Sequence, residues 1–208
     1  MSKMIKEKIE NALEWLKNGG LVIVADDEDR EAEGDMIGLG SKVTADNVNF
    51  IIKNARGLLC APVSPAIADK LDLYPMNQHN TDPYGTAFTI SVDYKDTTTG
   101  ISAADRALTI QKLSDPSSKA EDFYKPGHIL PLRAKQHGVL DRNGHTEAGL
   151  TLARLAGEPE VAYICEMIKP DGTMGRRPYL KEFAKTHEMP YFTIAELQEY
   201  VREFHPNI

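Results

Sequence analysis

The sequence predicts an α/β (α+β) fold, a single-domain layered sandwich in which helices flank a mixed β-sheet. The first observation behind this prediction is that apolar residues at helical spacing alternate along the chain with short apolar runs of strand type. The second is that no low-complexity linker and no repeat of fixed period divides the 208 residues, of which 41% are hydrophobic. We therefore expect residues 1–208 to form one domain with one substantial core, although these patterns do not specify the strand order.

Helices in the first half of the chain begin and end at recognisable capping residues. Glycines at positions 19 and 57 are expected to end two helices, Thr44 caps the second of them, and Ser64-Pro65 opens a short third helix. The elements expected here are helices over residues 2–18, 44–56 and 64–71 and strands over residues 21–25, 58–63 and 88–94.

The second half continues the alternation around a polar loop. Ser102 and Asp105 have the spacing of a capping box, which predicts a helix that runs to Leu113. Residues 114–128 (SDPSSKAEDFYKPGH) are polar and are expected to form a loop. The remaining expected elements are a helix from near Thr146 to Gly157, a strand over residues 161–168 (VAYICEMI), a turn at Asp171-Gly172, a helix after Pro178 and a helix capped by Thr193 and Glu196.

Composition argues against several classes of partner and location. The formal net charge is −7 at pH 7, whereas binding to nucleic acid or to an anionic membrane surface requires a basic face. No run approaches the roughly 18 consecutive apolar residues of a membrane span, and the N-terminus lacks the apolar run of a signal peptide. Cys60 and Cys165 lie in apolar, strand-like runs without metal-ligand spacing, which favours reduced thiols. We therefore expect a cytoplasmic protein with no nucleic-acid and no membrane partner.

The most unusual stretch is LVIVADDEDREAEGDMIG, residues 21–38. Seven carboxylates lie between Asp26 and Asp35, and Arg30 is the only cation among them. A charge run is most often a solvated loop. Here, however, the run directly follows a predicted buried strand, where α/β proteins gather ligands, and it closes with Gly34. Because so many carboxylates repel one another unless a cation intervenes, we interpret the run as a site for magnesium or manganese, which prefer oxygen ligands.

A calcium-binding EF-hand loop is the alternative metal site for this run. Asp29, Glu31, Glu33 and Gly34 fall at loop positions one, three, five and six of that motif. The twelfth position, however, is Gly40 in place of a bidentate glutamate, and a strand pattern precedes the loop where the motif needs a helix. The sequence therefore does not support an EF-hand.

A second group of functional residue types occurs at residues 141–150 (DRNGHTEAGL). Arg142 offers a planar guanidinium suited to phosphate, and Gly144 permits close approach of the backbone. Thr146 lies where a helix N-terminus would present amide donors to an anion, and His145 could complete a metal shell. A simple capped helix would also fit this stretch, but the combination of these residue types favours phosphate binding.

Three further positions are candidates because of their local context. Glu166 is the only charged residue of VAYICEMI, and a carboxylate in a buried strand is costly unless it is paired or used as an acid or base. His128 follows Pro126-Gly127 and precedes an apolar run, a setting in which a histidine is more often structural. The stretch TTTGISAADR, residues 97–106, places hydroxyls and a glycine before a helix and is weak evidence on its own.

Taken together, these motifs resemble those of the 3,4-dihydroxy-2-butanone 4-phosphate synthase family. The family acts in riboflavin biosynthesis, where it converts D-ribulose 5-phosphate to L-3,4-dihydroxy-2-butanone 4-phosphate and formate. The matching motifs span nearly the whole chain: DDEDREAEGD at 26–35, TTGISAADR at 98–106, PGHILPLRA at 126–134, RNGHTEAG at 142–149, and Glu166. No second catalytic domain follows them, so the chain is similar to the stand-alone form and not to the fusion with a GTP cyclohydrolase II domain.

The resemblance implies a magnesium-dependent lyase with a defined set of site residues. Glu31 and His145 would be the protein ligands of two magnesium ions, for which manganese is a possible substitute. The catalytic residues implied are His128 and Glu166, for the proton transfers, together with Asp26, Glu33 and Cys60. The substrate-binding residues implied are Arg30, Glu31, Asp35, Thr99, Arg142, Asn143, Gly144, His145, Thr146 and Glu166. The family also implies a homodimer with its sites at the subunit boundary.

Two other classes of function remain open at the level of the sequence. A metal-dependent aldolase or isomerase acting on the same sugar phosphate would use the same carboxylates, histidine and phosphate-binding groups. Only release of formate would distinguish the synthase from it. A non-catalytic module that binds anions or metals would tolerate neutralisation of Glu166, whereas an enzyme would lose turnover and keep its fold.

Overall fold

A seven-stranded mixed sheet forms the centre of the computed structural model, which describes residues 2–206. The strand order is β4-β5-β3-β6-β2-β1-β7. The strands are β1 Val22–Ala25, β2 Gly34–Leu39, β3 Cys60–Val63, β4 Val92–Tyr94, β5 Phe123–Arg133, β6 Ala162–Glu166 and β7 Tyr191–Thr193. The pairs β1/β7 and β3/β5 are parallel and the other four pairs are antiparallel, which confirms the predicted mixed sheet.

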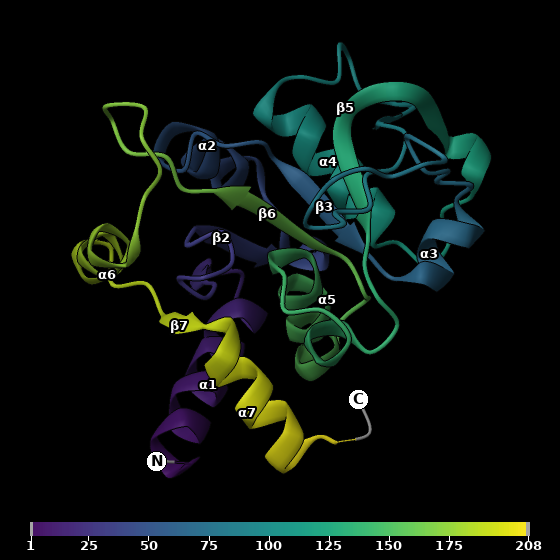
Figure 1. Cartoon of the computed structure of the whole chain (residues 1–208). Coiled ribbons are helices and arrows are strands. Elements are labelled where there is room, and N and C mark those ends of the chain that lie inside the picture. Colours follow the sequence, from purple (N-terminus) through teal and green to yellow (C-terminus); the bar gives the residue numbers. More distant parts are fainter. Residues whose placement is uncertain (1, 207–208) are drawn as a thin grey trace.

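Seven α-helices and three short 3₁₀ helices accompany the sheet in residues 2–206 (Figure 1). The α-helices are α1 Ser2–Lys17, α2 Ala45–Asn54, α3 Pro65–Lys70, α4 Ala103–Leu113, α5 His145–Ala156, α6 Arg177–Thr186 and α7 Ile194–Phe204. The 3₁₀ helices are η1 Gly40–Lys42, η2 Ala120–Asp122 and η3 Gly138–Leu140. Hydroxyl oxygens of Thr44, Ser64, Ser102 and Thr193 accept a hydrogen bond from the third residue of the helix that follows, which confirms the predicted caps.

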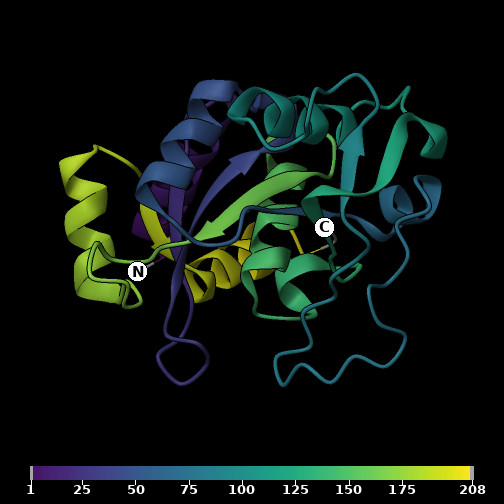
Figure 2. The same ribbon diagram turned by 90° about the horizontal axis from the view of Figure 1, so that it is seen from above.

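The helices lie on both faces of the sheet and bury two apolar cores. Residues of α2, α3, α4 and α6 belong to one cluster of buried side chains, and residues of α1, α5 and α7 belong to the other. Consecutive residues of β1 show the alternation, because Ile23 lies in the first cluster and Val24 in the second. The view from above shows the sheet between the two helical layers, as expected for a layered sandwich (Figure 2).

The sheet positions the acidic run at the tip of a hairpin. Strands β1 and β2 pair antiparallel with Ala25 opposite Gly34, so residues 26–33, called here the acidic loop, connect them. Strand β6 pairs with β2 on the other side and places Glu166 opposite Asp35. The acidic loop and the long connection between α3 and β4 project from the same side of the molecule (Figure 2). Chemistry-bearing residues therefore converge at one end of three neighbouring strands.

Strand β5 departs from the predicted elements. The expectation of a loop over residues 114–128 is wrong for its last part, because β5 begins at Phe123 and runs to Arg133. Exposure alternates along the first part of this strand, with Phe123 buried and Tyr124 64% exposed. The solvated face of this part of the strand carries Tyr124, Pro126 and His128, so the segment lacks the apolar run typical of a buried strand.

Three other strands also differ from the expectation. Strand β4 covers only residues 92–94 of the predicted 88–94. Strands β2 and β7 were not predicted: β2 contains Gly34, Asp35 and Gly38, which are poor strand formers, and β7 has only three residues. Among the helices of residues 2–206, none combines the length and the apolar character that crossing a bilayer requires.

Candidate active site

A cavity of about 140 Å³ lies where the β1–β2 hairpin, the end of β6 and the start of α5 meet. Its lining residues are Arg30, Glu31, Glu33, Asp35, Cys60, Thr86, Phe88, Leu132, Arg142, His145, Thr146, Ile164 and Glu166. Nine of these thirteen are residues that the sequence predicts for the site. The structure thus brings together the acidic run, the phosphate-binding candidates and the carboxylate of β6.

The carboxylate of Asp26 organises the acidic loop from inside. Asp26 is 1% exposed, and its two oxygens accept hydrogen bonds from the main-chain N–H groups of Glu31 at 3.1 Å and Glu33 at 2.8 Å. Arg30 Nη1 donates to the same carboxylate at 2.8 Å and to Glu31 Oε2 at 2.7 Å. Through these three hydrogen bonds, Asp26 stabilises the conformation of the loop that carries Glu31.

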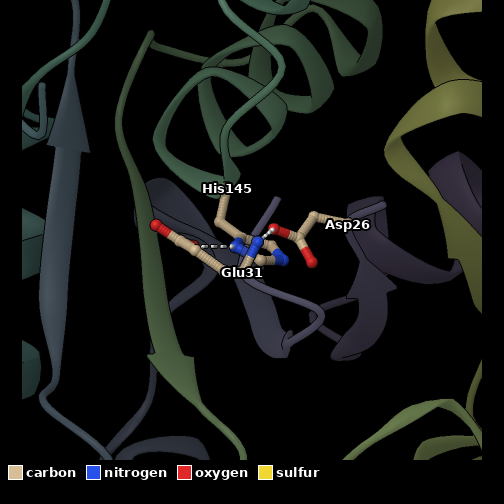
Figure 3. A group of neighbouring side chains, drawn as sticks. All are labelled: Asp26, Glu31 and His145. Carbon is tan, nitrogen blue, oxygen red and sulfur yellow. Dashed lines mark hydrogen bonds and ion pairs between the residues drawn. The ribbon is translucent and has the colours of Figure 1, made fainter. Parts of the chain in front are cut away.

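Asp26, Glu31 and His145 form a group with the geometry of a metal site (Figure 3). One potential ligand atom from each lies within 4.8 Å of the others. His145 Nδ1 is 3.9 Å from Glu31 Oε2 and 3.6 Å from Asp35 Oδ1. Burial lowers the pKa of His145 to about 4, so the imidazole is neutral near pH 7, which is the form that binds metals.

Unpaired polar atoms show that a divalent cation fits this group. Asp35 Oδ1 and His145 Nε2 are buried and have no hydrogen-bond partner among the described residues. Burial, and then repulsion from Glu166 and Glu31, raises the pKa of Asp35 well above its usual value. Carboxylate oxygens with one imidazole are a donor set that magnesium and manganese accept, and either ion would supply the missing partner.

Arg142 and the start of α5 form the opposite wall of the cavity. Arg142 Nε donates to the carbonyl of Tyr84 at 3.1 Å, Nη2 donates to Thr86 Oγ1 at 3.2 Å, and Nη1 pairs with the buried carboxylate of Glu147. Position 144 accepts only glycine without rearrangement, because a Cβ there would lie 2.0 Å from Arg142 Nη1. The guanidinium is therefore held in place beside the helix N-terminus, where an anion is stabilised.

Three other predicted catalytic residues surround the acidic group: Glu166 on β6, Cys60 on β3 and Glu33 in the acidic loop. Glu166 ends β6, and its Oε2 accepts a hydrogen bond from the main-chain N–H of Leu58 at 2.7 Å. Burial, followed by repulsion from Glu31, raises the pKa of Glu33. Burial, reinforced by Glu166 and Asp35, also raises the pKa of the Cys60 thiol, so Cys60 is protonated near pH 7 and is not an activated nucleophile.

Five predicted residues do not line this cavity: Asp26 and Gly144, which adjoin it as described above, and His128, Thr99 and Asn143. His128 lies on β5, its side chain is 44% exposed, and its Nδ1 is 2.7 Å from Asp93 Oδ2. Thr99 is exposed in the loop before α4, and Asn143 is exposed beside Arg142. The neighbouring Gly100 adopts a left-handed φ of +82°, and a Cβ there would lie 2.0 Å from Asp93 and 2.5 Å from His128 Nδ1. His128, Asp93 and the Gly100 turn therefore form a second group outside the cavity.

Several residues in and near the site are not among those predicted from the sequence. Asp93 is a charged residue in the strand-like run FTISVDY, the same signal that singled out Glu166, and could have been found in that way. Glu147 resembles any acidic residue in the first turn of a helix, and its pairing with Arg142 depends on the fold. Arg176 and Arg177, which contact the acidic loop, lie more than 140 positions away from it.

Comparison with known proteins shows the family. The model of the 3,4-dihydroxy-2-butanone 4-phosphate synthase family matches residues 10–200. The chain is 54% identical over 193 residues to the 3,4-dihydroxy-2-butanone 4-phosphate synthase of Oceanobacillus iheyensis. This match covers 93% of each chain. It is 52% identical to the riboflavin biosynthesis protein RibBA of Bacillus subtilis, where the match covers 92% of this chain and 48% of the relative.

Solved structures agree with this assignment. A crystal structure of 3,4-dihydroxy-2-butanone 4-phosphate synthase in complex with two magnesium ions matches with a TM-score of 0.91 and 39% identity, over 96% of this chain and 99% of that one. The enzyme of Candida albicans matches with a TM-score of 0.85 and 46% identity, over 93% of this chain and 96% of that one. These similarities confirm the resemblance seen in the motifs and the α/β fold. The chain belongs to the 3,4-dihydroxy-2-butanone 4-phosphate synthase family of riboflavin biosynthesis.

Proposed function

We propose that the protein converts D-ribulose 5-phosphate to L-3,4-dihydroxy-2-butanone 4-phosphate and formate, as a magnesium-dependent lyase. The observation that carries this proposal is one cavity in which Glu31 and His145 lie beside Arg142 and the first turn of α5. A sugar phosphate needs both features at once. Its phosphate requires cationic and amide donors, whereas its carbonyl and hydroxyl oxygens are ligands for a metal.

Arg142 and the N-terminus of α5 would hold the phosphate group of the substrate. The guanidinium has five N–H donors, and three contacts with protein groups leave donors free for phosphate oxygens. Thr146 lines the cavity at the second position of the helix and adds a hydroxyl, while Gly144 and Asn143 place the main chain beside it. Arg30 and Asp35 lie across the cavity, where the sugar hydroxyls would extend.

Glu31 and His145 would hold the magnesium ions. The relative described in complex with two magnesium ions supports a pair, and manganese is a plausible substitute because it accepts the same donor set. When bound, the ions supply Lewis acidity that polarises the substrate carbonyl and stabilises negative charge on oxygen. Asp26 would act through the loop, by holding the backbone of Glu31 in place.

Carboxylates of the cavity would transfer the protons of the reaction. Enolisation removes the proton at C3, dehydration expels the C1 hydroxyl, and a skeletal rearrangement precedes loss of C4 as formate, so protons move at several positions. Glu166 at the end of β6 is a proposed acid and base of these steps. Glu33 retains its proton to higher pH than an ordinary glutamate, which suits a donor, and the protonated Cys60 lines the wall without adding charge.

A second copy of the chain would bring His128 and Thr99 to the site. The cavity lacks both residues, although His128 is exposed and its ring is fixed by Asp93. Large apolar side chains are exposed on the same elements: Ile101 in the loop before α4 is 52% exposed and Tyr124 on β5 is 64% exposed. We therefore propose a homodimer in which His128 of the partner subunit completes the set of proton-transferring groups.

We further propose that residues 1–208 act as one synthase domain in the cytoplasm. One continuous sheet supports the first statement, because it contains strands from β1 near the start of the chain to β7 near its end. Two free, buried cysteines support the second, because thiols persist in a reducing compartment.

The function is tested by incubating the purified protein with D-ribulose 5-phosphate and MgCl₂ and measuring formate with formate dehydrogenase. We expect formate to accumulate, and its production to stop when EDTA is added in excess. Formate production by rigorously metal-free protein would contradict the metal assignment. Consumption of the substrate without formate would indicate an aldolase or isomerase, and binding without consumption would indicate a non-catalytic module.

A further inference from the structure

Two consecutive arginines at the start of α6 hold the main chain of the acidic loop. Arg176 Nη1 lies 2.6 Å from the carbonyl oxygen of Glu31 and 2.7 Å from that of Ala32. Arg177 Nη2 donates to the carbonyl oxygen of Asp26 at 2.9 Å. Neither arginine lines the cavity, so neither is placed to touch the substrate. Their contacts reach the loop from its outer side.

The loop needs such external contacts because of its conformation. Ala32 has a φ of +56°, in the left-handed region that is unfavourable for a residue with a Cβ. The N–H of Glu31 is bonded to Asp26 on the inner side, and the carbonyl of Glu31 is bonded to Arg176 on the outer side. Both main-chain polar groups of Glu31 are therefore fixed, and its carboxylate, which Arg30 also contacts, lies 3.9 Å from His145 Nδ1.

Arg30 and Arg177 lie near different carboxylates of the acidic run. Arg30 pairs with Asp26 and Glu31, whereas Arg177 lies 3.6 Å from Asp27 and 3.7 Å from Glu28. Arg176, by contrast, contacts the run through the main-chain carbonyl oxygens of Glu31 and Ala32.

We propose that Arg176 is a positioning residue that fixes the backbone of Glu31 and thereby strengthens binding of a divalent cation at Glu31 and His145. This inference rests on the proposed metal role of those two residues. The inference is testable because the charge of Arg176 and its hydrogen bonds have opposite effects on the affinity for a metal cation. Through space, a guanidinium repels a metal cation. Through the loop, it orders a metal ligand, and loss of such support typically weakens metal binding.

The experiment compares R176M, which removes the charge and the hydrogen bonds, with R176K, which keeps the charge and a donor. The hydrogen bonds from Arg176 to the carbonyls of Glu31 and Ala32 are called here the clamp. Because one nitrogen of Arg176 makes both bonds, the ammonium of a lysine could restore part of the clamp. R56M is the matched control: Arg56 lies beside Glu33 and Glu166 in an outer cavity, and within residues 2–206 its side chain donates only to the carbonyl of Lys53. It removes a nearby positive charge without removing a hydrogen bond to the acidic loop.

Two readouts separate the clamp from the catalytic proposal. Hydrogen exchange of peptides covering the acidic loop is measured on metal-free protein, and Mn²⁺ binding is measured by electron paramagnetic resonance of the free ion. We expect faster loop exchange in R176M than in the wild type, and Mn²⁺ binding about five- to tenfold weaker. We expect R176K to lie between the two, and R56M to bind Mn²⁺ as tightly as the wild type or slightly more tightly.

Each contrary outcome has a distinct meaning. Equal loop exchange in R176M and the wild type would overturn the clamp. Faster exchange with unchanged or tighter Mn²⁺ binding would overturn the link between the clamp and the metal site. A wild-type protein that binds no Mn²⁺ would refute the proposed metal role of Glu31 and His145 instead, while the exchange measurement would still report on Arg176. In kinetic assays, R176M should need more Mg²⁺ for half-maximal rate and keep its kcat within about twofold.

Discussion

Arg142 is the central residue of the wall that is proposed to bind phosphate. Its guanidinium contacts the carbonyl of Tyr84, the hydroxyl of Thr86 and the buried carboxylate of Glu147. These contacts come from the α3–β4 connection and from α5, so the plane of the guanidinium is fixed before a ligand arrives. A fixed plane favours two parallel hydrogen bonds to phosphate oxygens, which an ammonium cannot form.

The substitution R142K should therefore weaken substrate binding although it keeps the charge. We expect KM for D-ribulose 5-phosphate to rise about tenfold or more, with a smaller change in kcat. Steady-state formate production measures both constants. If KM and kcat are both unchanged, Arg142 does not bind the phosphate.

Glu166 and His128 differ from Arg142 because their proposed work is proton transfer. Each of E166Q and H128N removes a titrating group and leaves a side chain of similar size, so we expect turnover to fall by about a hundredfold or more while the substrate still binds. Titration calorimetry with D-ribulose 5-phosphate and a formate assay measure the two properties separately. A near-normal rate in either variant would remove that residue from the catalytic set.

Asp35 illustrates the stability cost of a buried acidic site. Its buried Oδ1 lacks a partner, and its pKa is raised well above the usual 3.8, mainly by burial. Since the folded state favours the protonated acid, Asp35 supports folding fully below about pH 4, and this contribution is lost as pH rises toward the raised pKa. D35N should therefore raise the Tm of metal-free protein at pH 7 by a few degrees, and by less at pH 4. Thermal unfolding in EDTA at both pH values is the measurement, and an equal or lower Tm at pH 7 would contradict the argument.

At the level of elements, the start of helix α5 leaves room for the Arg142 guanidinium because residue 144 is a glycine. A Cβ at position 144 would lie 2.0 Å from Arg142 Nη1 and 2.9 Å from Glu147 Oε2. We expect G144A to displace the guanidinium and to raise KM by several-fold, while circular dichroism shows an intact helical content. Unchanged kinetics in G144A would show that the guanidinium can move without loss of substrate binding.

Local signals explain which elements could be predicted from the sequence. The helices that start at Thr44, Ser64, Ser102 and Thr193 were predictable because a cap depends only on the next three residues. Strands β2 and β7 were not, because what stabilises them is pairing with β1, a partner that no local pattern reveals. The first part of β5 was missed for the related reason that one of its faces is solvated.

The same distinction applies to the candidate site. The acidic run and the RNGHTEAG stretch could be selected as candidate site segments from their residue types alone. The fold brings residues of both to one cavity. Arg176 has no local signal at all, because its role follows from the tertiary contact of α6 with a loop near the other end of the chain. Arg30 is the only cation within the run itself, and the fold brings Arg176 and Arg177 to it from the start of α6.

At the scale of the whole molecule, the position of His128 outside the cavity predicts a specific behaviour of mixed dimers. Chains carrying E166Q and chains carrying H128N, co-expressed with different tags, can be purified as heterodimers. If His128 acts in the site of the partner subunit, one of the two sites in each heterodimer is complete, and we expect about half of the wild-type activity per dimer. As a control, both parent homodimers, E166Q and H128N, must be inactive in the same assay. An inactive heterodimer would place His128 and Glu166 in the same subunit's site.

The distance along the chain between the acidic loop and its partners has a consequence for biosynthesis. A ribosome releases the carboxylates of residues 26–35 early, whereas His145, Arg176 and the strand β7 that pairs with β1 emerge much later. A nascent chain therefore carries a strongly anionic loop with neither its imidazole nor its clamp. The proposed metal site therefore gains its full support only once α6 has emerged, and a product truncated before α6 would keep the acidic motif but lack the contacts of Arg176 with Glu31 and Ala32.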